Sequence, residues 1–193
     1  MVFDGAWAEQ VLDVTLAPRA RFFGWEMLCL GRTTRGERIT TGEFRQRIRF
    51  VRCQNDLACT VGAVLPRHPV AIPVAVAPLP QTCAPIWRES MVLRGDDPLM
   101  ASALGMRGLP VIATAWIVFL AEAQDSATLL GEIRTVLSDA PLVAASSPEP
   151  GLIVVKAISD APESVRNLLI AVWSKIRMQV FRRTPELPRI WST

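Results

Sequence analysis

Strict alternation of apolar and charged side chains marks residues 44–51 as a strand with one buried face. The alternation divides the segment into two sets: Phe44, Gln46, Ile48 and Phe50 against Arg45, Arg47, Arg49 and Val51. A period of two is the mark of a half-buried strand, so the arginines are expected to line up on one surface. Residues 11–16 alternate in the same way and predict a second strand of this kind.

Glycines recur between these runs and favour turns there. They stand at positions 5, 24, 31, 36, 42, 95, 105 and 108. Glycine suits turns because it adopts positive φ without steric cost. Short strands with such regular punctuation favour an antiparallel or solenoid-like sheet over alternating strand and helix units. The longest apolar run, Val111 to Ala121, is too short to cross a bilayer and predicts a buried strand.

Two amphipathic helices are predicted in the last third of the chain. The first would begin at Asp125 or Ser126, and its apolar residues recur at helical spacing: Leu129, Leu130, Ile133, Val136 and Leu137. The second would begin at Asp160, which forms a capping-box-like start with Glu163 three positions later. Its stripe is more typical of a core than of a partner groove: Val165, Leu168, Leu169, Val172, Ile176 and Val180. Residues 151–158, between the helices, predict a strand.

The fold class that follows is mainly β. It would consist of stacked short strands, β-helix-like or an irregular sandwich, with two α-helices in the C-terminal third. A chain of 193 residues normally makes a single domain and is long enough to bury a core. Residues 53–84 interrupt the pattern with repeated prolines: Pro66, Pro69, Pro73, Pro78 and Pro80. Because proline is excluded from central strands, this stretch is expected to be a loop or insertion.

Composition and charge argue against several classes of protein. Hydrophobic residues make up 50% of the chain and charged residues 20%, which is typical of a globular protein that leaves apolar surface for a partner. A net charge of +3 is too small to argue for nucleic-acid binding. The first residues lack a basic segment followed by an apolar one, so no secretory signal is expected. The chain is therefore predicted to be soluble and cytoplasmic.

Three cysteines and the sole histidine form the strongest metal-ligand pattern. Cys53, Cys59, Cys83 and His68 could in principle bind zinc tetrahedrally. Structural zinc sites usually contain a close pair of ligands, and this chain has none at that spacing. The four cysteines of the chain are therefore expected to be reduced thiols. A small metal-binding module remains open as a minor alternative.

Catalytic patterns are weaker still, and no enzyme activity or catalytic residue is predicted. A single histidine leaves no convincing serine, histidine and aspartate arrangement, and no glycine-rich loop precedes a helix as in a phosphate site. The pair Asp96 and Asp97 follows Gly95 and precedes Pro98. Adjacent strand residues point to opposite faces, so this pair alone would not hold a metal. A turn in which aspartate bonds its own backbone is the simpler interpretation.

Four motifs follow one another along the chain. They are Leu28-Cys29-Leu30-Gly31-Arg32 with Gly36-Glu37, then Phe44-Arg45-Gln46-Arg47, Gly95-Asp96-Asp97-Pro98 and Pro188-Arg189-Ile190-Trp191-Ser192-Thr193. Together they resemble the central and C-terminal portion of the urease accessory protein UreD family. The resemblance implies a single UreD-like domain over residues 1–193 that lacks the N-terminal part of the family.

This resemblance implies a scaffold in nickel delivery to urease. Proteins of the family bind the urease apoprotein on one side and a UreF-like accessory protein on the other, and the GTPase UreG joins through UreF. Nickel would pass transiently through a polar tunnel, with no tightly bound cofactor. The alternative is a truncated copy that delivers no nickel, since a sheet without its first strands exposes unpaired edges.

The resemblance also implies roles for particular residues. Acids in or beside the matched motifs are candidates for the nickel path: Glu26, Glu37, Glu43 and Asp96. Candidates for partner binding are Arg32, Arg45, Arg47 and Trp191. Solvated side chains at turns and strand edges are the competing interpretation for each of them. Trp191 is the best single anchor, because a large aromatic residue contributes much buried area at an interface.

Overall fold

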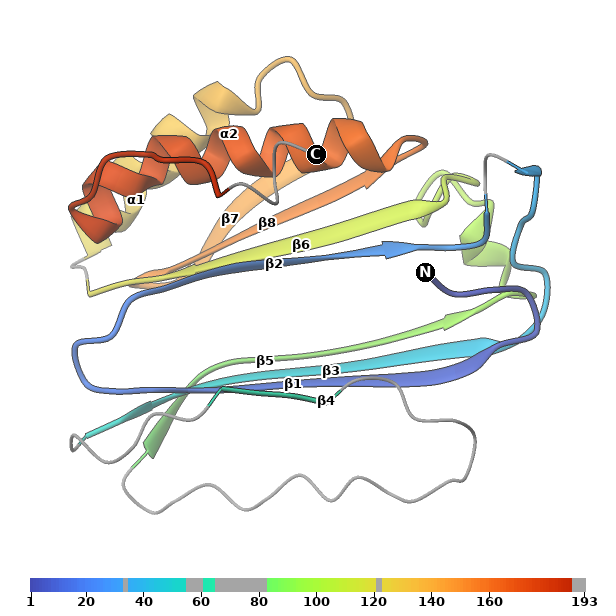
Figure 1. Ribbon diagram of the computed structural model, residues 1–193, viewed down its shortest axis with the longest axis horizontal. Helices are drawn as coiled ribbons and strands as arrows, with labels where there is room; N and C mark the ends of the chain where they lie inside the picture. The colour runs from blue at the N-terminus through green and yellow to red at the C-terminus, as the bar shows by residue number, and fades with distance from the viewer. Residues whose placement is uncertain (33–34, 55–60, 65–82, 121–122, 189–193) are drawn as a thin grey trace. The chain divides into compact units, whose positions relative to one another are not determined.

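The computed structural model describes residues 1–32, 35–54, 61–64, 83–120 and 123–188, and is mainly β with two α-helices, as predicted. Its elements are β1 (Trp7–Leu16), β2 (Phe22–Cys29), β3 (Glu43–Cys53), β4 (Val61–Val64), β5 (Cys83–Arg94), the 3₁₀ helix η2 (Pro98–Met100), β6 (Val111–Val118), α1 (Ala123–Val136), β7 (Val143–Glu149), β8 (Leu152–Ser159) and α2 (Pro162–Phe181). They form two four-stranded sheets, ordered β4-β1-β3-β5 and β2-β6-β8-β7 (Figure 1).

The chain divides into two compact units, one of residues 1–20 and 28–110 and the other of residues 21–27 and 111–193. The single domain expected from sequence stays a prediction. None of the helices in the described part of the chain is long and apolar enough to cross a bilayer.

The first sheet pairs strands that are distant in sequence. β1 and β3 run parallel, because β2 lies between them in sequence and joins the second sheet, while β4 and β5 pair antiparallel on the two outer sides. The alternation predicted for residues 44–51 is confirmed as far as Phe50, whereas Val51, which was expected on the arginine face, is 2% exposed and follows a shift in the β3–β5 register. Phe44 and Gln46 are each 5% exposed, Ile48 is 1% exposed and Phe50 is fully buried, whereas Arg45 is exposed.

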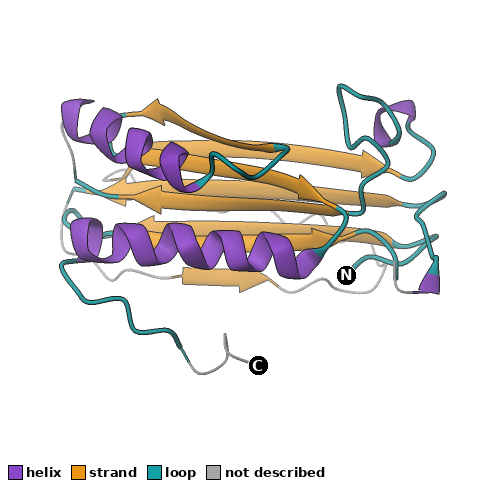
Figure 2. Cartoon of the chain, turned by 90° about the horizontal axis from the view of Figure 1, so that it is seen from above, coloured by secondary structure: helices purple, strands orange, loops and turns teal. Residues whose placement is uncertain are grey.

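The second sheet carries the two helices. β6 and β8, which pair antiparallel, contain most of its fully buried side chains and correspond to the strands predicted for residues 111–121 and 151–158. Both helices lie along one face of this sheet (Figure 2). The stripe predicted on the second helix is core, except that Leu168 is only half-buried and Trp173 is added: the buried residues of α2 are Val165, Leu169, Val172, Trp173, Ile176 and Val180.

Both helix starts differ from those predicted. α2 has Ala161 as its N-cap, and the preceding Ser159 hydroxyl accepts the Ala161 N–H at 3.1 Å. Asp160 is therefore not the capping residue that its spacing from Glu163 predicted. α1 begins at Ala123, which places Ser126 inside the helix. The buried Ser126 hydroxyl instead accepts the backbone N–H of Gly151 at 2.9 Å and ties α1 to the turn between β7 and β8.

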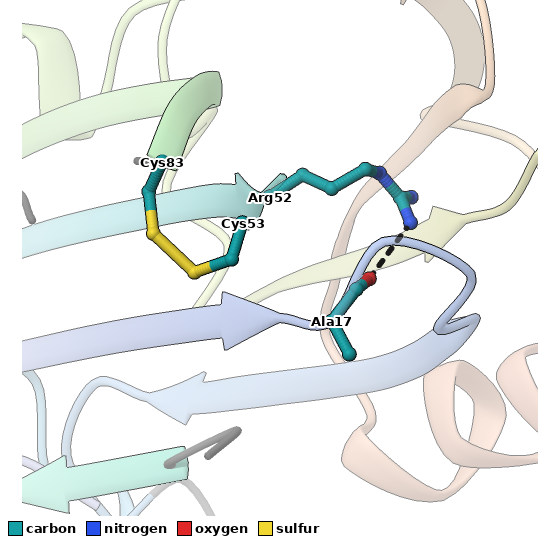
Figure 3. The surroundings of a disulfide bond; sticks show 4 residues. All are labelled: Ala17, Arg52, Cys53 and Cys83. Atoms are coloured by element: carbon teal, nitrogen blue, oxygen red, sulfur yellow. Dashed lines mark hydrogen bonds between the residues drawn. A yellow bond between two sulfur atoms is a disulfide. The ribbon is translucent and has the colours of Figure 1, made fainter. Parts of the chain in front are cut away.

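A disulfide joins Cys53 and Cys83, so the prediction that all four cysteines are reduced is wrong for this pair (Figure 3). The last residue of β3 lies opposite the first residue of β5, and their Cα atoms are 4.0 Å apart. Cys29 is a free thiol among the described residues. Cys59 and His68 lie outside the described residues, as does most of segment 53–84, although β4 forms a short strand within it.

Arg52, next to this disulfide, holds the turn between β1 and β2. One of its guanidinium nitrogens donates to the carbonyl oxygens of Ala17, Pro18 and Ala20 at 3.3, 2.9 and 2.9 Å (Figure 3 shows the first of these). Burial lowers the pKa of Arg52. The arginine thus satisfies carbonyl groups that the turn leaves without strand partners.

Candidate functional site

Glu43 is the most constrained of the predicted nickel-path acids. It begins β3, is only 5% exposed, and both of its carboxylate oxygens bind arginine. Arg94 on β5 donates from Nε to Oε2 at 2.8 Å, and Arg45 donates from Nε to Oε1. The hydrogen bond from Arg94 and then that from Arg45 hold the pKa of Glu43 below its usual range. Glu43 is thus an ionised anchor for two arginines rather than a free ligand.

A pocket lies beside Glu43 at the ends of β3 and β5. Its water-accessible volume is only about 10 Å³, and it is partly open to solvent. Glu43 and Arg94 supply its charged side chains, and the apolar wall comes from Val2, Leu30, Ile39, Phe44, Leu93 and Met100. A pocket with one neutralised ion pair and an otherwise apolar lining is typical of packing more than of metal binding.

The turn that carries Asp96 lies against the segment that leads into Glu43. The Gly95 N–H donates to the carbonyl of Gly42 at 3.2 Å. A Cβ atom on Gly95 would come within 2.4 Å of the Thr41 nitrogen, so this close approach requires glycine. Asp96 is exposed at this turn. The hydrogen bond with Glu43, and more weakly the charges of Asp96 and its neighbour, raise the pKa of Arg94.

Asp97 confirms the turn predicted for the motif Gly95-Asp96-Asp97-Pro98. Its Oδ1 atom accepts the N–H of Leu99 at 2.8 Å, and Asp97 caps η2. The loop that follows bonds mainly to itself; for example, the N–H groups of Met106 and Gly108 donate to the carbonyls of Leu99 and Met100. The motif therefore begins an ordered loop.

The remaining nickel-path candidates are separate from Glu43. Glu37 accepts a hydrogen bond from Nε of Arg32 at 2.6 Å, and the Arg32 guanidinium lies 5.3 Å from the ring centre of Phe3. Glu26 is a half-buried residue of β2 and belongs to the other unit. Within the ranges that the structure describes, no three histidine, cysteine, aspartate or glutamate side chains are grouped so as to hold a metal ion.

Arg45, Arg47 and Arg49 of β3 share one face, as predicted, and are paired with acids. Arg47 binds Glu9 at 2.8 Å and Arg49 binds Asp13 at 2.8 Å, both across the parallel pair with β1. Of the predicted partner-binding arginines, Arg32, Arg45 and Arg47 keep side chains that are 47%, 56% and 39% exposed. Each of these arginines would therefore contact a partner protein while its guanidinium group is still bound to a carboxylate of this chain.

Trp191, the predicted anchor, lies outside the described residues, but the structure exposes another tryptophan. Trp7, the first residue of β1, is 66% exposed and lies opposite Glu43 in the strand register. The signal that could have found it is the alternation of residues 11–16. Extended backwards, that alternation places Trp7 on the same face as Glu9 and Asp13.

Comparison with known proteins gives a match over nearly the whole chain. The sequence model described as UreD urease accessory protein matches residues 1–192. Similar proteins named urease accessory protein UreD include those of Dechloromonas aromatica at 28% identity, Azoarcus sp. strain BH72 at 32% and Pseudomonas paraeruginosa at 30%. Each match covers all of this chain but only 56% or 57% of the relative. The chain thus spans little more than half the length of these curated relatives.

Proposed function

Because the chain belongs to the UreD family of urease accessory proteins, we propose that it is a non-catalytic scaffold in urease maturation. It holds the urease apoprotein together with a UreF-like accessory protein, which a UreG-like GTPase joins, and assists nickel delivery in the cytoplasm. The observation that carries this proposal is the family match over residues 1–192. Nickel is cargo in this role and leaves with urease.

Both carboxylate oxygens of Glu43 bind arginine, so any contact of Glu43 with a cation in transit would have to be loose. Residues along a nickel path should attract the ion without surrounding it with a complete set of ligands, because a tightly bound nickel ion would not leave. Glu37 and Glu43 are already paired with arginine, which neutralises their charge. Asp96 is exposed, and it is the acid in this unit that we propose contacts nickel in transit.

Reconstitution of urease tests the proposed function. Urease subunits and the other accessory proteins are co-expressed without any UreD protein, with and without this chain, and nickel per urease active site is measured by mass spectrometry. We expect more nickel and more urease activity when the chain is present, and co-purification of the chain with the UreF-like protein. Nickel content equal to that of the control, without co-purification, would refute the proposal.

A further inference from the structure

Three adjacent strands of the first sheet bring an exposed tryptophan and two arginines together. Trp7 on β1 lies opposite Glu43 on β3, and Glu43 lies opposite Arg94 on β5. In the next row of the same face, Val92 lies opposite Arg45. Residues directly opposite each other project from the same face of a sheet. These five residues, Trp7, Glu43, Arg45, Val92 and Arg94, are called the Trp7 patch below.

The Trp7 patch is exposed and its arginines are held in place. Trp7 is 66% and Val92 49% exposed, and the side chains of Arg45 and Arg94 are 56% and 58% exposed. The buried carboxylate of Glu43 binds both guanidinium groups, one on each oxygen. A side chain fixed before binding loses less entropy when a partner arrives. Exposed arginines are therefore presented in a set geometry beside an exposed tryptophan.

The charge of the surrounding sheet face indicates the kind of partner. Eight charged side chains of the three strands share this face: Arg45, Arg47, Arg49, Arg88 and Arg94 against Glu9, Asp13 and Glu43. Five positive and three negative charges leave an excess of two positive charges. A second copy of the chain would bring the same excess to the interface, and like charges across an interface are unfavourable. Carboxylates on a different protein would complement it.

We propose that the Trp7 patch is a docking surface for a partner protein that offers an apolar slot bordered by carboxylates. Tryptophan and arginine are the residues most enriched among those that dominate binding energy, and they act best when a surrounding rim excludes water. Trp7 and Val92 supply the apolar contact, and Arg45 and Arg94 supply the charged contacts. The inference rests on the proposed function, since it names the surface by which the scaffold holds one of its partners.

Binding measurements on the full chain test this surface. Trp7→Ser is compared with Met178→Ser, which removes a side chain that is 50% exposed on α2. Affinity for the urease apoprotein and for the UreF-like protein is measured separately by biolayer interferometry. We expect Trp7→Ser to weaken binding to one of them about tenfold or more, and Met178→Ser to leave both unchanged. Both variants should keep the wild-type melting temperature, because each side chain is exposed.

The charged contacts of the patch are tested separately. Arg45→Gln removes one of the two arginine charges and leaves Glu43 bound to Arg94, and Arg183→Gln removes an exposed charge just beyond α2. We expect only Arg45→Gln to weaken binding, and the loss to shrink at high salt because exposed charges are screened.

Three outcomes would overturn the inference. If Trp7→Ser binds both proteins as tightly as the wild-type chain does, the patch is not a docking surface, and the proposed function is unaffected. If light scattering shows that the wild-type chain is a dimer and Trp7→Ser is a monomer, while partner binding is unchanged, the patch serves self-association instead. Failure of the wild-type chain to bind either protein would overturn the proposed function and this inference together.

Discussion

Cys53 and Cys83 face each other across β3 and β5 and are joined by a disulfide that spans a sequence separation of 30 (Figure 3). A cross-link of this span restricts the unfolded chain, which stabilises the fold by about 3 to 4 kcal/mol. We therefore expect Cys53→Ser with Cys83→Ser to lower the free energy of unfolding by about that amount, measured by urea denaturation without reductant. Cys29→Ser is the matched control, and equal unfolding midpoints for all three proteins would contradict the prediction.

Asp4 ties the N-terminal turn to residues 40–41, and this contact should depend on pH. Its Oδ1 atom accepts the N–H groups of Thr40 and Thr41 at 2.7 and 2.9 Å. These backbone hydrogen bonds, that of Thr40 first, hold the pKa of Asp4 below its ordinary value of 3.8. A depressed pKa gives stability that is present above the unfolded value and is lost as pH falls through the folded value.

Asp4→Asn should therefore lower the melting temperature at pH 7, where the carboxylate is ionised in both states. The difference from wild type should shrink as the pH falls below 3.8. Thermal unfolding followed by circular dichroism at a series of pH values measures it. The same difference at every pH would show that the carboxylate charge is unimportant. Asp139→Asn, at an exposed turn after α1, is the control.

Glu43 and Arg94 should behave as one unit in a double-mutant cycle. Glu43→Gln removes the charge that both arginines share, and Arg94→Gln leaves Glu43 with Arg45 alone. The stability losses caused by substituting two residues that share a partner do not add up. We expect the double variant to lose less stability than the two single losses combined, measured as unfolding free energies in urea. Strict additivity would mean that the ion pair contributes nothing.

Gly105 lies where any side chain would collide with the backbone. A Cβ atom there would stand 2.0 Å from the carbonyl oxygen of Leu99. We expect Gly105→Ala to destabilise the protein by about 1 to 3 kcal/mol, the usual cost of overpacking. Gly131→Ala provides the contrast, because nothing lies within 4 Å of its added Cβ and it sits in α1. That change should stabilise by roughly 0.5 to 1 kcal/mol, since alanine is the better helix former; destabilisation by both changes to the same extent would contradict the geometry.

The parts of the fold that sequence predicted are those whose side chains differ sharply between faces. β3 was found because arginine alternates with apolar residues, and α2 because its stripe is continuous. β2 shows no such contrast, since every one of its residues is half-buried. β5 begins in the proline-rich stretch and contains Pro85, which masked an otherwise alternating strand. Local periodicity cannot reveal strands of that kind.

The site was less predictable because its contacts join distant segments. The pairing of Glu43 with Arg94 crosses 51 positions of sequence, and the disulfide depends on the same β3–β5 register. No local spacing encodes that register. Trp7 itself could have been placed by extending the alternation of residues 11–16, but its neighbours on β3 and β5 depend on this register. Glu26, Glu37, Glu43 and Asp96 as a nickel path, and Arg32 and Arg47 as partner contacts, stay predictions.

The parallel pairing of β1 with β3 has a consequence for how the chain folds during its synthesis. Asp13 and Arg49, which meet across these strands, are 36 positions apart. During translation β1 leaves the ribosome well before β3 exists, and residues of the other sheet follow it first. Long-range pairing of this kind folds slowly and leaves a strand edge open meanwhile. We therefore expect the nascent chain to expose an unpaired edge of β1 until β3 has emerged.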